Sequence, residues 1–402
     1  MERSRTTPKE GRTLWVHLSI ITVAHMLNHV FVQIHLALVP VFMEEFGLDL
    51  FTVGLMATIP LLSQALMSLP FGMLADRFQH RFLIAAGLLT CGTAALLVSQ
   101  APNIYTIVLC LSMLALSSTL YHPPAYSLTS ELFPAQHRSR ALGIHGAGGT
   151  LGIASGPISA GIIMTIFGQS SWRFAYLMWA VPSILSVFLI VRMRPGSSGT
   201  SARVERAEEP VPPPSLRSIF TISFIALLLM IGIGSFGSQA ISTFLTTYLK
   251  EERAIPIETA QILFGSISLT GIVSAPVGGV LADKIGEKRW LTVAYVGLLI
   301  AVVGIAFSPS MVVLIPSILF YGFFTYSGMG ARSSLVARFT PASRRGIAYA
   351  MYFLPFSLVG SVSPMVSAYV VKVWGVWYVF PFAIAIFIIA LTILQLIPIR
   401  ES

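Results

Sequence analysis

Long apolar runs separated by short polar segments extend over most of the chain. Each run has about 20 residues or more, the length that an α-helix needs to cross the hydrocarbon core of a bilayer. Twelve runs qualify: 14–43, 51–75, 82–100, 103–129, 139–167, 172–192, 218–249, 257–282, 289–308, 311–337, 344–372 and 375–398. The short alternating segments of a β-barrel are lacking from the sequence. The pattern predicts an all-α membrane protein with twelve transmembrane helices.

One polar stretch is longer than the others and divides the chain near its middle. Residues 194–218 are rich in Pro, Gly, Ser and charge, a composition that cannot form a buried core. The first run is too long for a cleaved signal peptide, so we expect it to be retained. The predicted organisation is a tail (1–13), a six-helix bundle (14–192), a linker (193–217), a second six-helix bundle (218–398) and a tail (399–402).

The two predicted bundles share a sequence repeat. The segment GMLADR at 72–77 recurs as GVLADK at 279–284, so that Asp76 and Asp283 are 207 residues apart. The same offset relates Pro157 to Pro364. Matches in one register over half of a chain indicate duplication, and duplicated membrane bundles are usually transporters with the substrate site between the halves.

Composition and charge agree with a membrane location. The chain is 55% hydrophobic and only 10% charged, against about 25% charged in soluble domains. The net charge of +9 might suggest nucleic acid, but 20 of the 25 lysines and arginines lie in segments on one side if the spans alternate. Four lie on the other side, and Arg332 lies within a span. The positive-inside rule then places both termini in the cytoplasm and excludes a polyanionic partner as the reason for the charge.

These motifs resemble the major facilitator superfamily, which has twelve helices in two pseudo-symmetric halves. Its signature between the second and third helices is similar to GMLADRFQHR here, with Gln79 where a glycine is usual; the second copy, GGVLADKIGEKR, has Gly286 there. The glycines would let helices approach closely, and each aspartate would pair with cations or cap a helix. The resemblance implies a conformational latch made of Gly72, Asp76, Arg77, Arg81, Gly279, Asp283, Lys284 and Arg289.

A second pattern lies in the fifth run. The spacing of Gly152, Gly156 and Pro157 resembles the antiporter motif of the family, with a weaker copy ending at Pro364. Small residues four apart permit close helix packing, and proline frees a carbonyl and bends a helix. We expect these four residues to form hinges; generic tight packing is the alternative. The motif is associated with drug/proton exchange in the family.

The first and fourth runs resemble the branch that contains the fosmidomycin-resistance exporters. That branch has a His-x-x-Asn-Asp pattern and an aromatic-His-Pro pattern. His25, Asn28 and the sequence Tyr121-His122-Pro123 match them, whereas His29 replaces the acid of the first pattern and Pro124 follows the second where an acid is usual. The departures remove two carboxylates that might otherwise carry protons.

The polar residues of the first run fall on one side of a helix. At 100° per residue they lie within an arc of about 160°: His25, Asn28, His29, Gln33 and His35. Ionisable residues inside a membrane are costly and are functional candidates. Histidine has an unperturbed pKa near 6.5, so we expect His25 or His29 to bind protons or substrate; neutral histidines bonded to neighbouring helices are the alternative.

A metal site is the competing interpretation of the same residues. His25 and His29 are four apart, and His122 and His145 lie on other predicted helices. Histidines so arranged can share zinc or iron. Because no carboxylate lies mid-span with them, we expect no resident metal.

Arg332 is the one Lys or Arg deep within a predicted span. A buried guanidinium needs an anionic partner, and a substrate carboxylate or phosphonate is one hypothesis. The alternative is bonding to carbonyls or to Glu131. Tyr121, His122 and His145 of the first half and Tyr326 and Arg332 of the second complete the predicted substrate and proton site.

The sequence thus predicts a secondary active transporter that exports a small anionic or amphipathic compound in exchange for protons by alternating access. A proton-coupled uptake carrier for an organic acid is the alternative, and a non-transporting receptor is a third class. No nucleotide loop or nucleophile–base pair is recognisable, so we expect no enzyme activity and no cofactor. We expect a monomer in a bacterial or archaeal cytoplasmic membrane, in contact with lipid.

Overall fold

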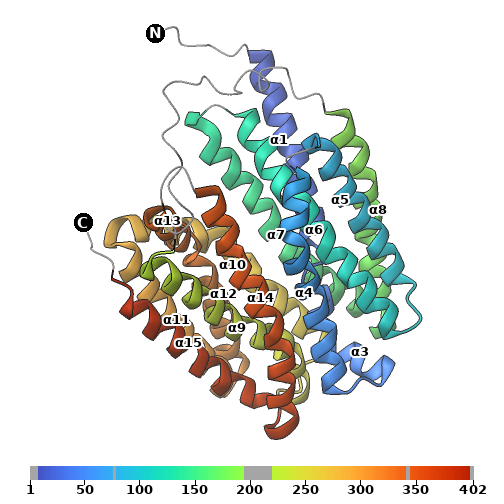
Figure 1. Cartoon of the computed structure of the whole chain (residues 1–402). Helices are drawn as coiled ribbons and strands as arrows, with labels where there is room; N and C mark the ends of the chain where they lie inside the picture. The colour runs from blue at the N-terminus through green and yellow to red at the C-terminus, as the bar shows by residue number, and fades with distance from the viewer. Residues whose placement is uncertain (1–7, 76–77, 134, 194–219, 341–344, 399–402) are drawn as a thin grey trace. The chain divides into compact units, whose positions relative to one another are not determined.

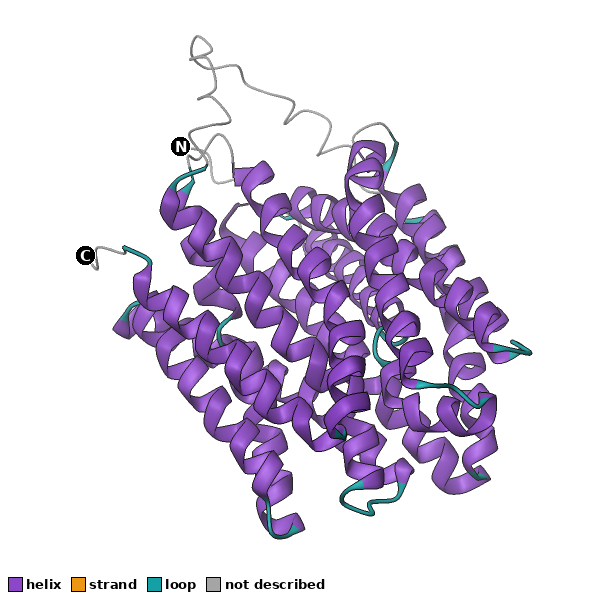
Figure 2. Ribbon diagram, turned by 60° about the horizontal axis from the view of Figure 1, so that its bottom comes forward, coloured by secondary structure: helices purple, strands orange, loops and turns teal. Residues whose placement is uncertain are grey.

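A computed structural model describes residues 8–75, 78–133, 135–193, 220–340 and 345–398 of the chain. Within those residues every regular element is a helix (Figure 2). The expected all-α class is confirmed.

The helices of the predicted first half follow one another with short connections (Figure 1). They are α1 (Pro8–His29), α2 (Ile34–Ala37), α3 (Val39–Phe46), α4 (Leu50–Ala75), α5 (His80–Ser99), α6 (Ile104–Leu132), α7 (Ala135–Phe167), the 3₁₀ turn η1 (Gln169–Ser171) and α8 (Trp172–Arg192).

The predicted second half has a similar series. It comprises α9 (Ile222–Glu251), α10 (Ile257–Ile285), α11 (Glu287–Phe307), α12 (Met311–Ser327), α13 (Met329–Phe339), α14 (Arg345–Trp374), the 3₁₀ turn η5 (Val376–Tyr378) and α15 (Val379–Leu396).

Eleven helical segments in the described part of the chain are long and apolar enough to cross a membrane. The remaining predicted run, 344–372, corresponds to the 30-residue helix α14. The predicted number of spans therefore agrees with the structure, and the protein is a multi-pass membrane protein.

Several helix boundaries follow from capping residues. The Asn103 side chain accepts a hydrogen bond from Thr106 N at 3.0 Å, and Thr221 accepts one from Phe224 N at 3.2 Å, which caps α6 and α9. Gly47, with φ of 61°, ends α3 in the left-handed conformation that glycine adopts without strain.

The first run differs from its prediction as one continuous helix. The helix α1 ends at His29, and a turn precedes α2. Val32 N bonds to His29 O at 3.1 Å, so an i→i+3 bond replaces the helical i→i+4 bond there. The single helical wheel drawn through His25 and His35 is therefore wrong beyond His29.

The chain forms two compact units. The first comprises the described residues of 1–32, 66–153 and 173–209, and the second comprises those of 33–65, 154–172 and 210–402. These units do not follow the predicted six-helix halves, because segments of the first half pack on helices of the second. The halves rest on the sequence repeat and stay a prediction, and the linker (193–217) falls almost wholly outside the described residues.

The core of the first unit joins four helices. Buried apolar side chains of α1, α5 and α6 and of the end of α8 form one cluster: Ile21, Ala24, Leu27, Ile84, Ala85, Leu88, Tyr121, Ala125, Leu128, Ile190 and Met193. This packing fixes α1 against α6, the helices that carry His25, His29 and His122.

The second unit contains close contacts between segments from both predicted halves. A Cβ on Gly161 of α7 would lie 2.5 Å from the Glu258 carbonyl oxygen of α10, and one on Gly54 of α4 would lie 3.1 Å from Met365 Cα of α14. Thr246 of α9 donates to the Leu36 carbonyl at 3.2 Å. These contacts lie toward the ends of the spans where the charge pattern places the outer side.

Candidate functional site

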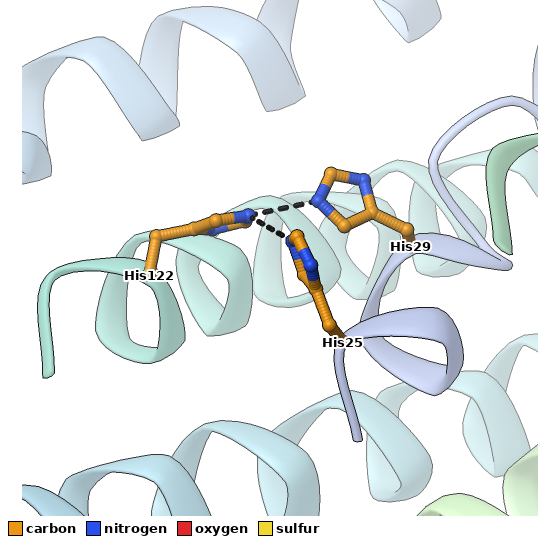
Figure 3. A group of neighbouring side chains, drawn as sticks. All are labelled: His25, His29 and His122. Carbon is orange, nitrogen blue, oxygen red and sulfur yellow. Dashed lines mark hydrogen bonds between the residues drawn. The ribbon is translucent and has the colours of Figure 1, made fainter. Parts of the chain in front are cut away.

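Three imidazoles of the first unit converge on one point (Figure 3). His122 Nε2 of α6 lies 2.8 Å from His29 Nε2 and 3.2 Å from His25 Nε2, both of α1. One nitrogen from each residue lies within 4.8 Å of the others. His25 is 3% exposed, and His29 and His122 are partly buried, so none of the three is a fully exposed surface histidine. The structure thus brings together three predicted residues: His25 and His29 of the first span, and His122, which follows them by more than 90 positions.

Other rings surround this cluster. His145 of α7 stacks on His25 with ring centroids 4.1 Å apart, and its ring nitrogens have no hydrogen-bond partner within the described residues. Tyr121 stacks on the rings of His25 and His145. It is fully buried, and its hydroxyl donates to the Ile21 carbonyl at 2.9 Å. Tyr126 lies edge-on to His145 at 5.3 Å. The Tyr121 hydroxyl already has a backbone partner. The role of Tyr121 in substrate binding stays a prediction.

Glycines of α7 make the space for the cluster. A Cβ on Gly149 would lie 2.6 Å from His25 Cε1, and one on Gly152 would lie 2.9 Å from His29 Cβ. A Cβ on Gly148 would lie 2.6 Å from the Thr22 carbonyl oxygen. The glycine-rich face of the fifth span therefore lies against the histidine helix α1 and leaves room for the His25 ring and for the Cβ of His29.

The remaining polar residues of the first run divide between the two units. Asn28 is 3% exposed and belongs to the first unit; its side-chain nitrogen and oxygen are buried without a partner in the described part of the chain. Gln33 and His35 belong to the second unit. There, Ser268 donates to Gln33 Oε1 at 3.5 Å and bonds to the Tyr326 hydroxyl at 2.9 Å.

Arg332 lies in α13, just after the break between α12 and α13 at Gly328. Its Nη2 donates to the Thr325 carbonyl at 3.3 Å, as the carbonyl-bound alternative predicted, while its Nε is buried without a partner among the described residues. Arg332 thus retains an unused donor inside the protein. Because Arg332 and His122 lie in different units, the idea that they face one another stays a prediction.

The predicted latch is only partly within the described residues. Asp76 and Arg77 lie outside them, and the burial of Gly72 lies outside the description as well. Arg81 donates to the Met193 carbonyl at 3.1 Å. In the second copy Asp283, Lys284 and Arg289 are exposed.

The glycine that permits close packing in the second copy is not the predicted one. A Cβ on Gly279 would meet nothing within 4 Å, whereas one on Gly278 would lie 2.6 Å from the Ser327 carbonyl carbon. The expectation for Gly279 was wrong because the helix turns the preceding position toward α12.

The predicted hinge residues are inside helices. Gly156 and Pro157 are buried within α7, and Pro364 is buried within α14. Both helices continue through their prolines, and a hinge function stays a prediction.

Some contacts of the site had no signal in the sequence. The Ser118 carbonyl bonds to His122 Nδ1 at 2.6 Å, and the His145 carbonyl bonds to His25 Nδ1 at 2.7 Å. Glu287 accepts hydrogen bonds from Ser334 at 2.8 Å and from Arg338 at 3.2 Å, next to the second latch motif. Backbone carbonyls have no sequence signature, and Glu287 lies close to its partners only in the fold.

Comparison with known families agrees with this architecture. The model described as Major Facilitator Superfamily matches residues 21–330 and 227–402, so the chain belongs to this family. Its members include transporters, and the chain is a membrane transporter of that family.

Individual relatives are consistent with this assignment. The fosmidomycin resistance protein of Escherichia coli is 23% identical over 279 residues, which cover 69% of this chain and 68% of that protein. The multi-drug resistance efflux pump PmrA of Streptococcus pneumoniae is 26% identical over 385 residues, which cover 90% and 91%. The expected similarity to the drug-exporter branch is confirmed.

A solved structure shares the fold. A bacterial homologue of the human lysosomal transporter Spinster, in an inward-facing and unoccupied conformation, superposes with a TM-score of 0.82 over 98% of each chain. The sequence identity is 17%, so the likeness concerns the fold alone.

Proposed function

We propose that the protein is a secondary active transporter that exports a small anionic or amphipathic compound in exchange for protons. It works as a monomer by alternating access, in the cytoplasmic membrane of a bacterium or archaeon with both termini inside. The charge asymmetry of the loops supports this orientation. The names of the fosmidomycin resistance protein and of PmrA support export.

The histidine cluster is the observation that supports the proposal of proton coupling. The side chains that contact its rings are histidine, tyrosine and serine. They come from α1 (His25, His29), α6 (Ser118, Tyr121, His122, Tyr126) and α7 (His145). On α5, Cys91 lies near the Asn28 carbonyl, with 3.9 Å between its sulfur and that oxygen. Imidazole binds and releases protons near neutral pH, which these other groups do not.

In the proposed cycle, protons would move into the cell in one half of the cycle and the substrate would move out in the other. Gly152, Gly156, Pro157 and Pro364 would act as hinges, and the two latch motifs would stabilise one end of the cycle. A pH difference of one unit supplies about 1.4 kcal/mol per proton, enough for about tenfold accumulation of an exchanged neutral solute.

Counterflow in proteoliposomes tests this proposal. Purified protein is reconstituted with an entrapped pH-sensitive dye, and radiolabelled fosmidomycin serves as the probe because of the similarity to the fosmidomycin resistance protein. We expect an imposed pH gradient to drive the probe against the proton flow. Movement of the probe with the protons would contradict export and support uptake.

The histidines of α1 are tested by a paired substitution. We expect His25→Gln with His29→Gln to make transport independent of pH, because both proton acceptors are lost from one helix. His17→Gln, on the same helix, is the matched control and should retain the pH profile. A double variant with an unchanged profile would place the proton site elsewhere.

The uptake alternative is favoured by Arg332 and by the two missing carboxylates of the first and fourth spans. Arg332 has an unused Nε donor, and a guanidinium inside a membrane favours an anion. We expect Arg332→Ala to weaken binding of an anionic probe at least tenfold and to leave that of a cationic drug unchanged. Equal binding of the anion by both proteins would contradict an anionic substrate.

A further inference from the structure

The backbone restricts the protonation states of two of the three converging imidazoles. His25 Nδ1 lies 2.7 Å from the His145 carbonyl, and His122 Nδ1 lies 2.6 Å from the Ser118 carbonyl. A carbonyl oxygen can only accept, so each Nδ1 carries the hydrogen. In the neutral ring, each Nε2 therefore presents a lone pair.

Two of these lone pairs face each other. His25 Nε2 and His122 Nε2 are 3.2 Å apart, and two neutral rings of this tautomer have no hydrogen to place between them. His29 Nε2 lies 2.8 Å from the same His122 atom, so a hydrogen on His29 satisfies His122 but leaves His25 without a donor. Only an added cation, a proton or a metal ion, makes all three nitrogens mutually attractive.

The separation of His25 and His122 is close to that of a metal site, whereas His29 and His122 are closer together, so metal binding requires a small outward movement of the His29 ring. Zinc–imidazole bonds of about 2.0–2.1 Å at a tetrahedral centre place neighbouring ligand nitrogens about 3.3 Å apart. The observed separations from His122 Nε2 are 2.8 and 3.2 Å. Metal-binding histidines commonly donate their other N–H to a backbone carbonyl, which is what His25 and His122 do.

We propose that Nε2 of His25, His29 and His122 form a binding site for a first-row transition-metal ion such as Zn²⁺, with an open coordination position for an anionic donor. His29 joins by presenting its Nε2 lone pair; its Nδ1 is buried without a partner in the described part of the chain, so no hydrogen bond opposes that tautomer. Three neutral ligands leave the charge of a divalent ion uncompensated, and a small anion on the open position compensates it.

Protons and the metal ion compete for the same lone pairs. Metal binding is therefore favoured when the imidazoles are neutral and is lost on acidification, with proton release on binding. The site does not depend on proton-coupled export: a metal can bind to a carrier that works in either direction.

Direct binding of the metal alone tests the site. Protein purified through a tag without histidines is titrated with Zn²⁺ by calorimetry in detergent, and Co²⁺ is used in parallel because its visible spectrum reports tetrahedral nitrogen ligands. We expect one ion per chain. His122→Gln and His29→Gln should each weaken binding at least tenfold, whereas His17→Gln, outside the cluster on α1, should bind as the wild type does.

Two outcomes overturn the proposal. One is wild-type binding no tighter than that of the triple variant His25→Gln, His29→Gln, His122→Gln; the other is a Co²⁺ spectrum that the triple variant retains. The thermal unfolding of each variant without metal is measured alongside, so that a variant that fails to fold is replaced by the corresponding Asn substitution. Failure of metal binding with intact proton counterflow would leave the transport proposal standing.

Discussion

Two backbone carbonyls decide which nitrogen of His25 and of His122 carries hydrogen. The carbonyls of His145 and Ser118 accept from Nδ1, at 2.7 and 2.6 Å, and so direct the Nε2 lone pairs toward each other. The chemistry of the cluster therefore depends on groups whose side chains are not part of it. A substitution that moves either carbonyl would change the proton affinity of the cluster without removing a histidine.

Asp49 illustrates residue-scale chemistry outside the spans. It caps α4, with its carboxylate accepting a hydrogen bond from Thr52 N at 2.8 Å. Hydrogen bonds from the Thr52 hydroxyl and backbone hold the pKa of Asp49 below its ordinary value of 3.8. Because the folded-state pKa is the lower one, the carboxylate stabilises the fold above the ordinary value, and this contribution is lost as the pH falls through the folded-state pKa.

Asp49→Asn isolates that contribution, since asparagine caps a helix without titrating. We expect the melting temperature of the wild type to fall more than that of Asp49→Asn between about pH 6 and about pH 3. Thermal unfolding in detergent measures the difference. Parallel pH profiles for the two proteins would show that folding does not lower the pKa of Asp49.

At the scale of elements, the glycine face of α7 allows α1, the helix that carries His25 and His29, to pack closely against it. The Cβ positions of Gly148, Gly149 and Gly152 are taken by atoms of α1. The antiporter-like spacing of the sequence therefore has a local structural consequence, which is room for the His25 ring and for the Cβ of His29. Tight packing of α7 and a functional role of its glycines, which the sequence left as alternatives, are therefore compatible.

Gly149→Ala tests this contact. The new Cβ would lie 2.6 Å from His25 Cε1, so the ring must move, at a cost of about 1–3 kcal/mol of stability. We expect a lower melting temperature and an altered pH profile of transport. Gly146→Ala is the control on the same helix, because its Cβ would meet nothing within 4 Å. If both substitutions behave alike, the close approach of the two helices is not what positions His25.

At the scale of the whole molecule, the second compact unit contains contacts between segments of the two predicted halves, which the proposed alternating-access cycle would break. Glu44 of α3 forms an ion pair with Lys250 of α9, and Gln261 of α10 donates to the Met164 sulfur of α7 at 3.3 Å. The Glu44–Lys250 pair is partly exposed, so it contributes at most about 1 kcal/mol to the contact between α3 and α9. Most of that contact rests on helix packing.

Cross-linking across this closure tests the cycle. In Glu44→Cys with Lys250→Cys, we expect a reducible bismaleimide to stop transport and reduction to restore it, because the outer ends can no longer separate. Each single-cysteine variant should be unaffected; the native Cys91 and Cys110 are buried. Undiminished transport by the cross-linked protein would contradict opening at this end.

Features that depend on neighbouring residues in the chain were predictable. The spans followed from runs of about 20 apolar residues. The break after His29 was not predictable from periodicity, since an apolar run does not show where the i→i+4 ladder stops. Likewise the repeat indicated that a glycine permits close helix packing, but only the rotation of α10 placed Gly278, and not Gly279, against the end of α12.

The sequence by itself determined the class of protein, the number of spans, the family and the residue types of the candidate site, because hydrophobic length, charge distribution and motif spacing are local properties. Only the tertiary structure decided that His122 meets His25 and His29, from which it is separated by 97 and 93 positions, and which ring nitrogens face each other. Helix rotation and backbone carbonyls control that convergence, and neither is encoded at any single position.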